Sequence, residues 1–383
     1  VWAHHQDLLA PEPTALAQVL SRTGWVRTLG GVEAYLAMRA RCPNLTAADV
    51  HEAVQTGDLC VTPSVRGCIY LVPKADLPLA LAISDALSSK RRQADLRKVH
   101  VSADELAHVC DAITEALASG PLTTAGLRKA LPDGVVRSLG DAGKKIGLSS
   151  TLPPALRELE ATGRIRRRPQ NHQLDHERYE WVAHTGTEDH APLPQVAQAL
   201  AQRFFQWSGA STLDAFVAWS GLGKRVAKTA VDTLDLQPVQ IEGVGERLTA
   251  CTRVPDATGR AIGIPGMDNL HHLPQSAAPF VSAAYHGLTV GAFGARRVGQ
   301  LGTVKHLFER MIVVDGRFVG AWGYDPDHHT VEAHVWEPDF AEPAQAEAAS
   351  LTAFLKPLGG GKVFSIDKDE NLRTRLARVR SYA

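Results

Sequence analysis

Long apolar runs are what this sequence most clearly lacks. In 383 residues no run reaches the ~18 apolar residues that a membrane helix needs, and no signal-peptide pattern opens the chain. These absences argue against a protein with transmembrane helices. We expect a cytoplasmic protein that has no membrane partner.

Cysteine is also scarce. The five cysteines are odd in number, scattered, and never spaced as Cys-x-x-Cys. Such a set supplies neither a disulfide framework nor a zinc site, so we expect buried free thiols, no metal and no cofactor. The adjacent pair His328-His329 is expected to lie in a solvated loop, because neighbours on a strand point to opposite faces and rarely share one ion.

Neither sign of charge is in excess. Lysine and arginine number 41, aspartate and glutamate also number 41, and the formal net charge is zero. This balance argues against a protein that coats nucleic acid indiscriminately, but it permits a local basic face. The hydrophobic content of 44% and the charged content of 21% are typical of a globular protein, and the length allows two or three domains.

A helix followed by a basic hairpin is the most informative stretch that is present. Within Thr151–Val182, Leu152, Leu156 and Leu159 recur at helical spacing, and Gly163 predicts a left-handed C-cap. A helix that ends at glycine and leads into a hairpin is typical of the back half of a winged helix. In such a module the helix lies against a DNA groove and the hairpin, or wing, contacts the flanking phosphates.

Two β-like runs form the predicted wing, Arg164–Arg168 and Arg178–Val182, joined by a polar tip at residues 169–177. The alternative interpretation is a solvated charged hairpin in an ordinary α/β protein. The arginines of the wing are Arg164, Arg166, Arg167 and Arg168.

The same plan of helices and a hairpin is expected in residues 1–101. An amphipathic helix over Lys74–Ser89 and a separate basic run over Lys90–His100 close this unit, and Thr46 is expected to cap a helix. The other predicted elements are helices over Thr14–Thr23, Thr28–Ala40 and Ala47–Thr56 and strands over Leu59–Val61 and Cys68–Val72.

Two further units and a C-terminal domain follow, at residues 102–190, 191–252 and 253–383. The second unit adds helices over Ser102–Ala118 and Thr124–Leu131 and a loop over Pro132–Ser150; the third has helices over Gln195–Trp207, Thr212–Ser220 and Gly223–Leu234. Strands are predicted over Tyr285–Val290, Met311–Val314, Arg317–Trp322 and Thr330–Trp336, and helices over Pro343–Leu355 and Leu372–Tyr382. Trp207, Trp219 and Trp322 fall within apolar patterns, so we expect them in the core. We therefore predict an α+β fold of three tandem winged-helix units followed by a β-rich C-terminal domain.

Four segments in order resemble the bacterial AlkZ/YcaQ-like crosslink-repair DNA glycosylases. One is similar to the family's R-G-[ST]-L-H-L-V-P, one to L-P-G-F-D, and one to V-D-G-R-V-V-G-T-W. The segments are Val65-Arg-Gly-Cys-Ile-Tyr-Leu-Val-Pro73, Ala210-Ser-Thr-Leu-Asp-Ala-Phe-Val-Ala-Trp-Ser-Gly221, Ile264-Pro-Gly-Met-Asp268 and Val313-Val-Asp-Gly-Arg-Phe-Val-Gly-Ala-Trp322. The resemblance implies tandem winged helices that form a concave surface for duplex DNA.

The resemblance also implies a chemistry, the excision of bulky N7-alkylated purines. Alkylation at N7 makes the purine a cationic leaving group, so the enzyme mainly positions a water and stabilises the charge that develops at C1′. In the family a Gln-x-Gln or Gln-x-Asp motif does this. Aligned without gaps between Gln6 and Arg41, its two positions fall on Arg27 and Leu29.

Neither residue replaces the original chemistry. Arginine has donors but no acceptor and stays charged, and leucine has no polar atom in its side chain. The family's histidine in R-G-x-L-H is Tyr70 here. Glu33, expected one turn beyond Leu29 on the same helix, or Asp268 are the candidate substitute carboxylates; the alternative for each is a surface ion pair or a structural cap.

We therefore predict a monomeric, nucleoid-associated protein that binds duplex DNA, including damaged DNA, with impaired catalysis. The alternatives are an active glycosylase that uses a substitute carboxylate and a scaffold for a protein partner. The residues expected to contact DNA are Arg27, Arg91, Arg92, Arg157, Arg164, Arg166, Arg167, Arg168, His172 and Gln173.

Overall fold

The computed structural model describes residues 15–28, 30–42, 44–184, 190–241, 245–249, 289–290, 310–314 and 317–381. Within these ranges the chain is a mixture of helices and small, mainly antiparallel sheets, which confirms the predicted α+β class. No helix in the described ranges is both long enough and apolar enough to cross a bilayer.

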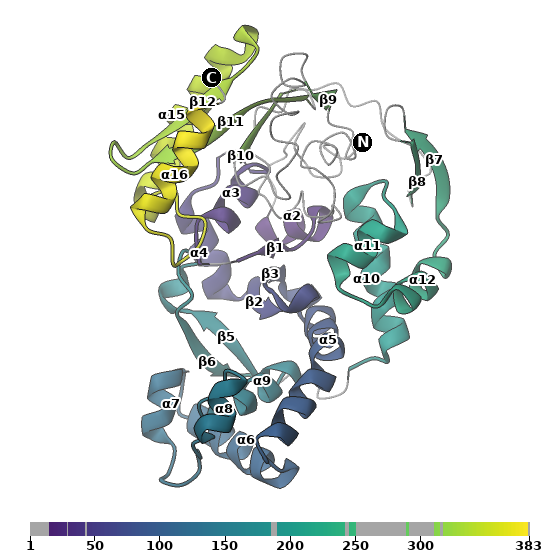
Figure 1. The fold of residues 1–383 in the computed structure, drawn as a ribbon, viewed down its shortest axis with the longest axis vertical. Coiled ribbons are helices and arrows are strands. Elements are labelled where there is room, and N and C mark those ends of the chain that lie inside the picture. Colours follow the sequence, from purple (N-terminus) through teal and green to yellow (C-terminus); the bar gives the residue numbers. More distant parts are fainter. Residues whose placement is uncertain are drawn as a thin grey trace.

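The first unit lies at the centre of the molecule (Figure 1). Its three strands form one antiparallel sheet in the order β1-β3-β2. Thr46 caps α4 in a capping box with Asp49, as predicted. Its elements are α2 (Leu16–Thr23), β1 (Val26–Arg27), α3 (Glu33–Arg39), α4 (Ala47–Thr56), β2 (Leu59–Pro63) and β3 (Ile69–Pro73).

The predicted helix over Thr28–Ala40 is wrong in its first part, since α3 begins only at Glu33. Two glycines explain the late start. Gly30 has a φ of +67°, which a continuous helix cannot contain. A methyl group at Gly31 would lie 2.2 Å from the carbonyl oxygen of Val363, so only glycine fits beneath that segment. Glu33 is therefore the first residue of α3, and Leu29 lies outside the described residues.

The helix after β3 is longer than predicted. α5 (Leu77–Lys98) continues through the basic run that was expected to be separate. Arg92 supports this continuity because its guanidinium bonds Ser88 one turn back and Asp85 two turns back, both at 2.6 Å.

The second unit lies at the bottom of Figure 1, beside the C-terminal half of α5. Its sheet has the order β4-β6-β5, the same arrangement as in the first unit. Gly163 after α9 has a φ of +73°, which confirms the left-handed position, and the expected loop over Pro132–Ser150 contains a short helix, α8. The elements are α6 (Ala103–Leu117), β4 (Leu122–Thr123), α7 (Thr124–Ala130), α8 (Gly140–Lys145), α9 (Leu152–Ala161), β5 (Ile165–Pro169) and β6 (Tyr179–Ala183).

The third unit follows the same order on the other side of the first sheet. A single bridge between Ser211 and Leu248 stands where the other units have their first strand. The elements are α10 (Leu193–Ser208), α11 (Leu213–Ser220), α12 (Lys224–Asp232), β7 (Gln237–Ile241) and β8 (Gly245–Thr249).

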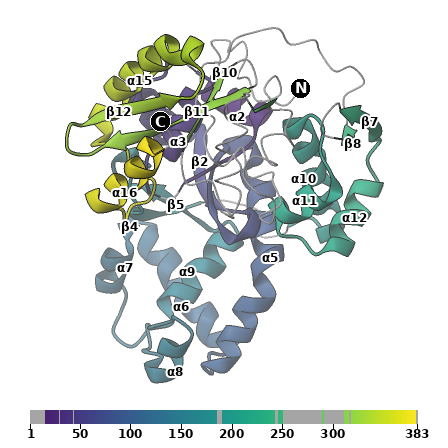
Figure 2. The same ribbon diagram turned by 45° about the horizontal axis from the view of Figure 1, so that its top comes forward.

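The C-terminal part stands beside α3, with its helices over one sheet (Figure 2). Strand β11 is central: it pairs with β10 and β12 antiparallel and with β9 parallel. The elements are β9 (Thr289–Val290), β10 (Arg310–Val314), β11 (Arg317–Asp325), β12 (Thr330–Val335), α15 (Ala341–Leu355) and α16 (Asp369–Arg380).

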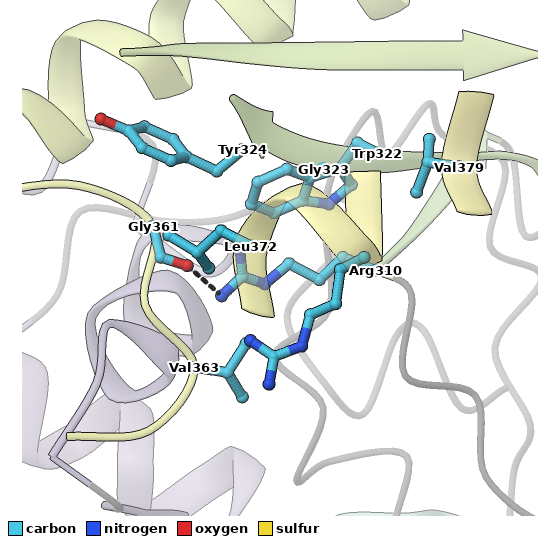
Figure 3. A pocket seen from close by; sticks show the side chains of 9 residues that line it. Arg310, Trp322, Gly323, Tyr324, Gly361, Val363, Leu372 and Val379 are labelled. Carbon is cyan, nitrogen blue, oxygen red and sulfur yellow. Dashed lines mark hydrogen bonds between the residues drawn. The ribbon is translucent and has the colours of Figure 1, made fainter. Parts of the chain in front are cut away.

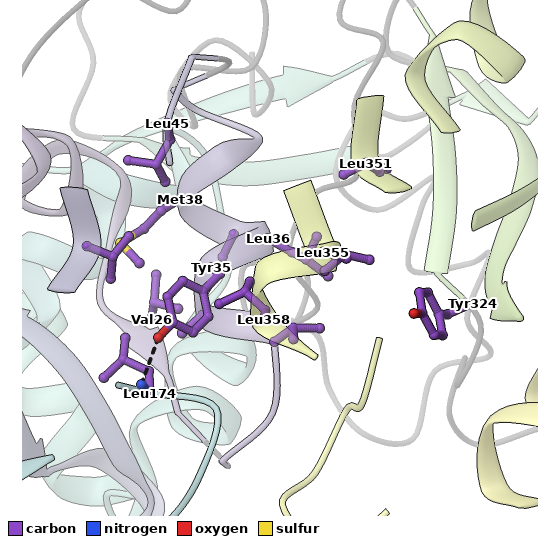
Figure 4. Close-up of a cluster of buried hydrophobic side chains, with 14 of the residues drawn as sticks. Val26, Tyr35, Leu36, Met38, Leu45, Leu174, Tyr324, Leu351, Leu355 and Leu358 are labelled. Carbon is purple, nitrogen blue, oxygen red and sulfur yellow. Dashed lines mark hydrogen bonds between the residues drawn. The ribbon is translucent and has the colours of Figure 1, made fainter. Parts of the chain in front are cut away.

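Three hydrophobic cores within the described ranges hold these parts together, and each of them crosses a predicted unit boundary. One core joins α3 and the first sheet to the C-terminal part, where Leu36 lies near Leu355 and Leu358 (Figure 4). A second joins the first sheet and α5 to the third unit, and includes Trp207 and Trp219. The third core belongs to the second unit and the end of α5. The boundaries at residues 101, 190 and 252 stay a prediction, but residues 15–101 have no core of their own.

Three tryptophans that the apolar pattern assigned to the interior are buried. Trp207 and Trp322 are 1% exposed and Trp219 is 3% exposed. Trp207 packs edge-on against both Trp219 and Trp25 and donates a hydrogen bond to the carbonyl of Ser21. It therefore fixes α10 against the turn that leads into β1.

Candidate nucleic-acid interface

The basic hairpin formed by β5 and β6 has its central arginine turned into the protein. Arg167 makes two bonds to the Glu160 carboxylate, at 2.6 Å and 2.5 Å. Its guanidinium also lies 5.1 Å from the ring centre of Tyr179 and 5.4 Å from that of Trp181. The Glu160 side chain is only 4% exposed, so this is a buried charge pair clamped between aromatic rings. Its geometry holds α9 to the hairpin.

The other arginines of the hairpin are half-buried and also have partners within the protein. Arg164 bonds Asp111 and Thr114 on α6. Arg166 reaches across to β2, where its Nη1 lies 3.7 Å from the Sγ of Cys60. Arg168 bonds Glu180 across the strand pair at 2.8 Å. The side chains of Arg164 and Arg168 are 31% and 32% exposed, against 15% for Arg167.

Helix α9 is covered along one side by α5, which lies next to it in both views of the fold (Figures 1 and 2). Arg92 joins the two helices through a bond to Glu158 at 3.2 Å. Arg91 and Arg157 lie on the exposed surface of this pair of helices, and Arg91 is 89% exposed. Of the expected contacts in this region, Arg91 and Arg157 are exposed, and Arg91 also pairs with Asp95 at 3.7 Å. Arg92 is bound by the carboxylates of Asp85 and Glu158.

The tip of the hairpin docks on the first unit. The backbone N–H of Leu174 donates to the Tyr35 hydroxyl at 2.8 Å, and His51 bonds the same hydroxyl at 2.8 Å. Burial raises the pKa of Tyr35 and lowers the pKa of His51. His172 and Gln173 are half-buried in this tip, and His172 has a φ of +61°. The hairpin is therefore held at both ends, by Tyr35 at its tip and by Glu160 at its base.

Arg27 lies on β1, half-buried and directly opposite Tyr70 on β3. Tyr70, at the position of the family's histidine, is 1% exposed and accepts a hydrogen bond from Arg66 at 2.7 Å. The tyrosine is thus a core residue of the sheet. Arg27 brings a permanent positive charge to the same sheet.

Glu33, the candidate substitute carboxylate at the start of α3, is bound to Arg310. Both Nε, at 2.9 Å, and Nη2 of Arg310 donate to the same Glu33 oxygen. The arginine lies 4.6 Å from the ring centre of Trp322 and also donates to the carbonyl of Gly361 at 3.3 Å (Figure 3). With side-chain exposures of 14% for Glu33 and 6% for Arg310, this is a buried ion pair, in place of the surface pair considered from sequence.

Two further candidates lie outside the described residues, namely Leu29 and Asp268. Sequence reasoning missed Arg310, because nothing in the local pattern links it to a glutamate 277 positions away. It also left the basic face of α12 out of the expected contacts. Lys224, Arg225 and Lys228 are exposed there, with Lys228 about one turn beyond the adjacent Lys224 and Arg225.

Among the described residues, no group of three or more His, Cys, Asp or Glu is placed to hold a metal ion. His328 instead bonds the Asp325 carboxylate at 2.9 Å. This hydrogen bond raises the pKa of His328. His328 lies in the turn between β11 and β12.

Comparison with known proteins gives one family and one fold. A sequence model described as DNA glycosylase AlkZ-like matches residues 30–355. A solved structure of Streptomyces sahachiroi DNA glycosylase AlkZ is similar with a TM-score of 0.65 and 15% sequence identity, over 93% of this chain and 95% of that chain. No curated protein matches the sequence. The family match begins after Arg27 and Leu29, so it does not bear on those two positions.

Proposed function

The chain belongs to the AlkZ-like DNA glycosylase family, and we propose that it is a winged-helix protein of DNA repair that binds duplex DNA without excising N7-alkylpurines. The repeated order of helix, strand or bridge, two or three helices and a hairpin supports three winged-helix units. The winged-helix architecture supports DNA as the partner, since such modules present a helix and a hairpin to the duplex.

The DNA contacts that we propose are electrostatic. Three groups of basic side chains offer charge to phosphates: Arg91 and Arg157 on the surface of α5 and α9, the half-buried Arg164, Arg166 and Arg168, and the exposed Lys224, Arg225 and Lys228 on α12. Arginine forks bind phosphate oxygens well, and such contacts carry little base information. Binding should therefore be strong at low salt and show little sequence preference.

The absence of excision rests on one observation above all, the buried ion pair between Glu33 and Arg310. A carboxylate that two guanidinium donors already hold is a poor base, because protonating it would strand a buried arginine. Arg27 offers no acceptor for an attacking water and adds positive charge where positive charge would develop at C1′. We assign Arg27 the role of holding a DNA phosphate.

A single-turnover assay on a duplex with one 7-methylguanine tests this function. The wild-type protein should bind the duplex but release no base faster than spontaneous depurination, because the missing water-positioning groups are worth ~10² to 10⁴ in rate. Anisotropy measured on the same duplex reports the binding. The double substitution of Arg27→Gln and Leu29→Gln restores the family motif and should gain excision if these are the catalytic positions.

The alternatives give different results in the same assay. Excision by the wild type that Glu33→Gln or Asp268→Asn abolishes would identify an active glycosylase with a substitute carboxylate. Excision that survives both changes would mean that Arg27 and Leu29 are not the catalytic positions. A protein that binds no duplex at low salt would be a scaffold. Arg27→Ala should weaken DNA binding, and unchanged affinity would reduce Arg27 to a structural residue.

A further inference from the structure

Ile366 is the most exposed large apolar side chain in the described part of the molecule. It is 84% exposed, and the only other large hydrophobic residue described as exposed is Leu193 at 37%. Single exposed apolar residues are common on protein surfaces, so exposure alone carries no function. What distinguishes Ile366 is the structure that supports it and the place where it stands.

A set of side-chain bonds holds the turn below Ile366 rigid. One oxygen of Asp367 accepts the backbone N–H groups of Val363 at 3.0 Å and Phe364 at 3.1 Å. Arg375 on α16 bonds both oxygens of the same carboxylate, at 2.6 Å and 3.1 Å. Asp367 is itself buried, so the residue before it is presented to solvent from a fixed base.

The turn stands where the first unit, the basic hairpin and the C-terminal part meet. The hydroxyl of Ser365 donates to Glu177, in the tip of the hairpin, at 2.6 Å. Ser365 also lies over Gly30, three residues beyond Arg27, where an added methyl group would be 2.6 Å from the Ser365 Cβ. The backbone N–H of Val32 donates to the carbonyl of Lys362 at 2.8 Å. Ile366 therefore projects from a turn that packs on Gly30, three residues along the chain from Arg27.

The charges near this turn are mixed, with exposed cations on its two sides. Lys362 and Lys368 flank the turn in sequence, and Arg178 follows Glu177 at the tip of the hairpin. The carboxylates of Asp369 and Glu370 lie on the first turn of α16, beyond Lys368. An apolar tip between separated cations suits a duplex, whose phosphates border a stack of apolar bases.

We propose that Ile366 is a wedge that enters an unstacked base step of duplex DNA, with Lys362 and Lys368 on the flanking phosphates. This inference rests on the proposed function, since it requires that DNA binds at this face. Proteins that kink DNA insert isoleucine, leucine or methionine between base steps, and the gain comes from covering the apolar side chain and the exposed base faces. The wedge would favour damaged sites, where part of the unstacking has already occurred.

The test uses two duplexes that contain 2-aminopurine, a base whose fluorescence rises when it is unstacked. In one duplex, called the gapped duplex, the analogue lies beside an abasic site, which leaves a gap in the base stack. In the other duplex the analogue lies in intact sequence. Wild-type protein should bind the gapped duplex more tightly and raise the fluorescence on saturation. Ile366→Ser should lose the fluorescence rise and about tenfold of affinity for the gapped duplex, the effect of leaving one such side chain unburied.

Two controls separate the wedge from a general loss of structure. Ile366→Met should keep the response, because methionine can also enter the stack. Leu193→Ala, at the other exposed apolar residue, should change neither affinity nor fluorescence. Salt-dependent binding without any fluorescence rise in the wild type would overturn the wedge while leaving the proposed DNA binding intact. The absence of binding to either duplex would overturn both, and an unchanged response in Ile366→Ser would overturn the wedge alone.

Discussion

The second and third units share one order of elements but use their positive charge differently. In the second unit, Arg167 is sandwiched between aromatic rings and bound to a buried glutamate. In the third, Lys224 and Lys228 of α12 pair with Asp214 and Asp232, and all four side chains are more than half exposed. A solvated pair contributes little and can exchange its carboxylate for a phosphate, whereas a buried pair cannot. The number of basic residues in a unit therefore does not determine its capacity to bind DNA.

Packing around the two units explains the difference. The second unit lies against both α5 and β2, so its arginines meet other elements before they meet solvent. Helix α12 packs mainly on α10 and α11, and its outer face has no other described element over it. The most basic stretch of the sequence is therefore the more structural one.

The largest expected effect breaks the buried pair of the second unit. Arg167→Ala should lower the free energy of unfolding by about 3 to 5 kcal/mol, because it leaves the Glu160 charge buried and unpaired. Urea unfolding followed by tryptophan fluorescence measures it. Arg225→Ala on α12 is the matched control and should stay within about 0.5 kcal/mol of wild type. Similar stabilities for the two variants would contradict the claim that the basic residues are structural in the second unit and solvated in the third.

A smaller effect is expected on DNA binding, where changes in the third unit should matter more than changes in the second. Replacing Lys224, Arg225 and Lys228 by alanine should flatten the slope of log affinity against log salt by about 2.7, or 0.9 for each lost phosphate contact, with no change in stability. Replacing Arg166 and Arg168, which are only half exposed, should flatten it by no more than about 1.8. Anisotropy titrations across a salt series measure both. An unchanged slope in the α12 variant would show that its exposed charge plays no part in binding.

The smallest expected effect is a pH dependence of the free energy of unfolding, which arises from His184 in the second unit. Burial, together with the nearby charges of Arg166 and Lys74, lowers the pKa of His184 at the end of β6. Below the unfolded pKa of about 6.5 the unfolded chain takes up this proton more readily than the folded chain, so the free energy of unfolding should fall as the pH falls from about 7 to about 5. His184→Gln should remove part of that fall in urea titrations at several pH values. Identical pH profiles for both proteins would contradict the assignment.

Local chemistry predicted much of the fold. The cap at Thr46 and the left-handed Gly163 depend on neighbours within a few residues, and both are where the sequence placed them. The buried tryptophans followed from apolar spacing in the same way. These features depend on interactions between residues close together in sequence, so periodicity and turn-forming residues are enough to predict them.

What could not be predicted depends on residues far apart. The late start of α3 depends on the close approach of Val363 to Gly31. The burial of Glu33 in an ion pair depends on Arg310. The hairpin arginines could be counted from the sequence, but their partners Glu160 and Asp111 could not be identified from it. Charge is visible in a sequence, whereas its neutralisation is a property of the folded molecule.

The pair between Glu33 and Arg310 also sets an order of assembly. Its members are 277 positions apart, and the core around α3 takes side chains from α15 and the segment after it. The second unit draws its core from residues between Leu96 and Trp181, so it can close while the ribosome is still translating the rest. The sheet that carries Arg27 must wait until the C-terminal helices have emerged. The part of the chain that is made first is the part that is finished last.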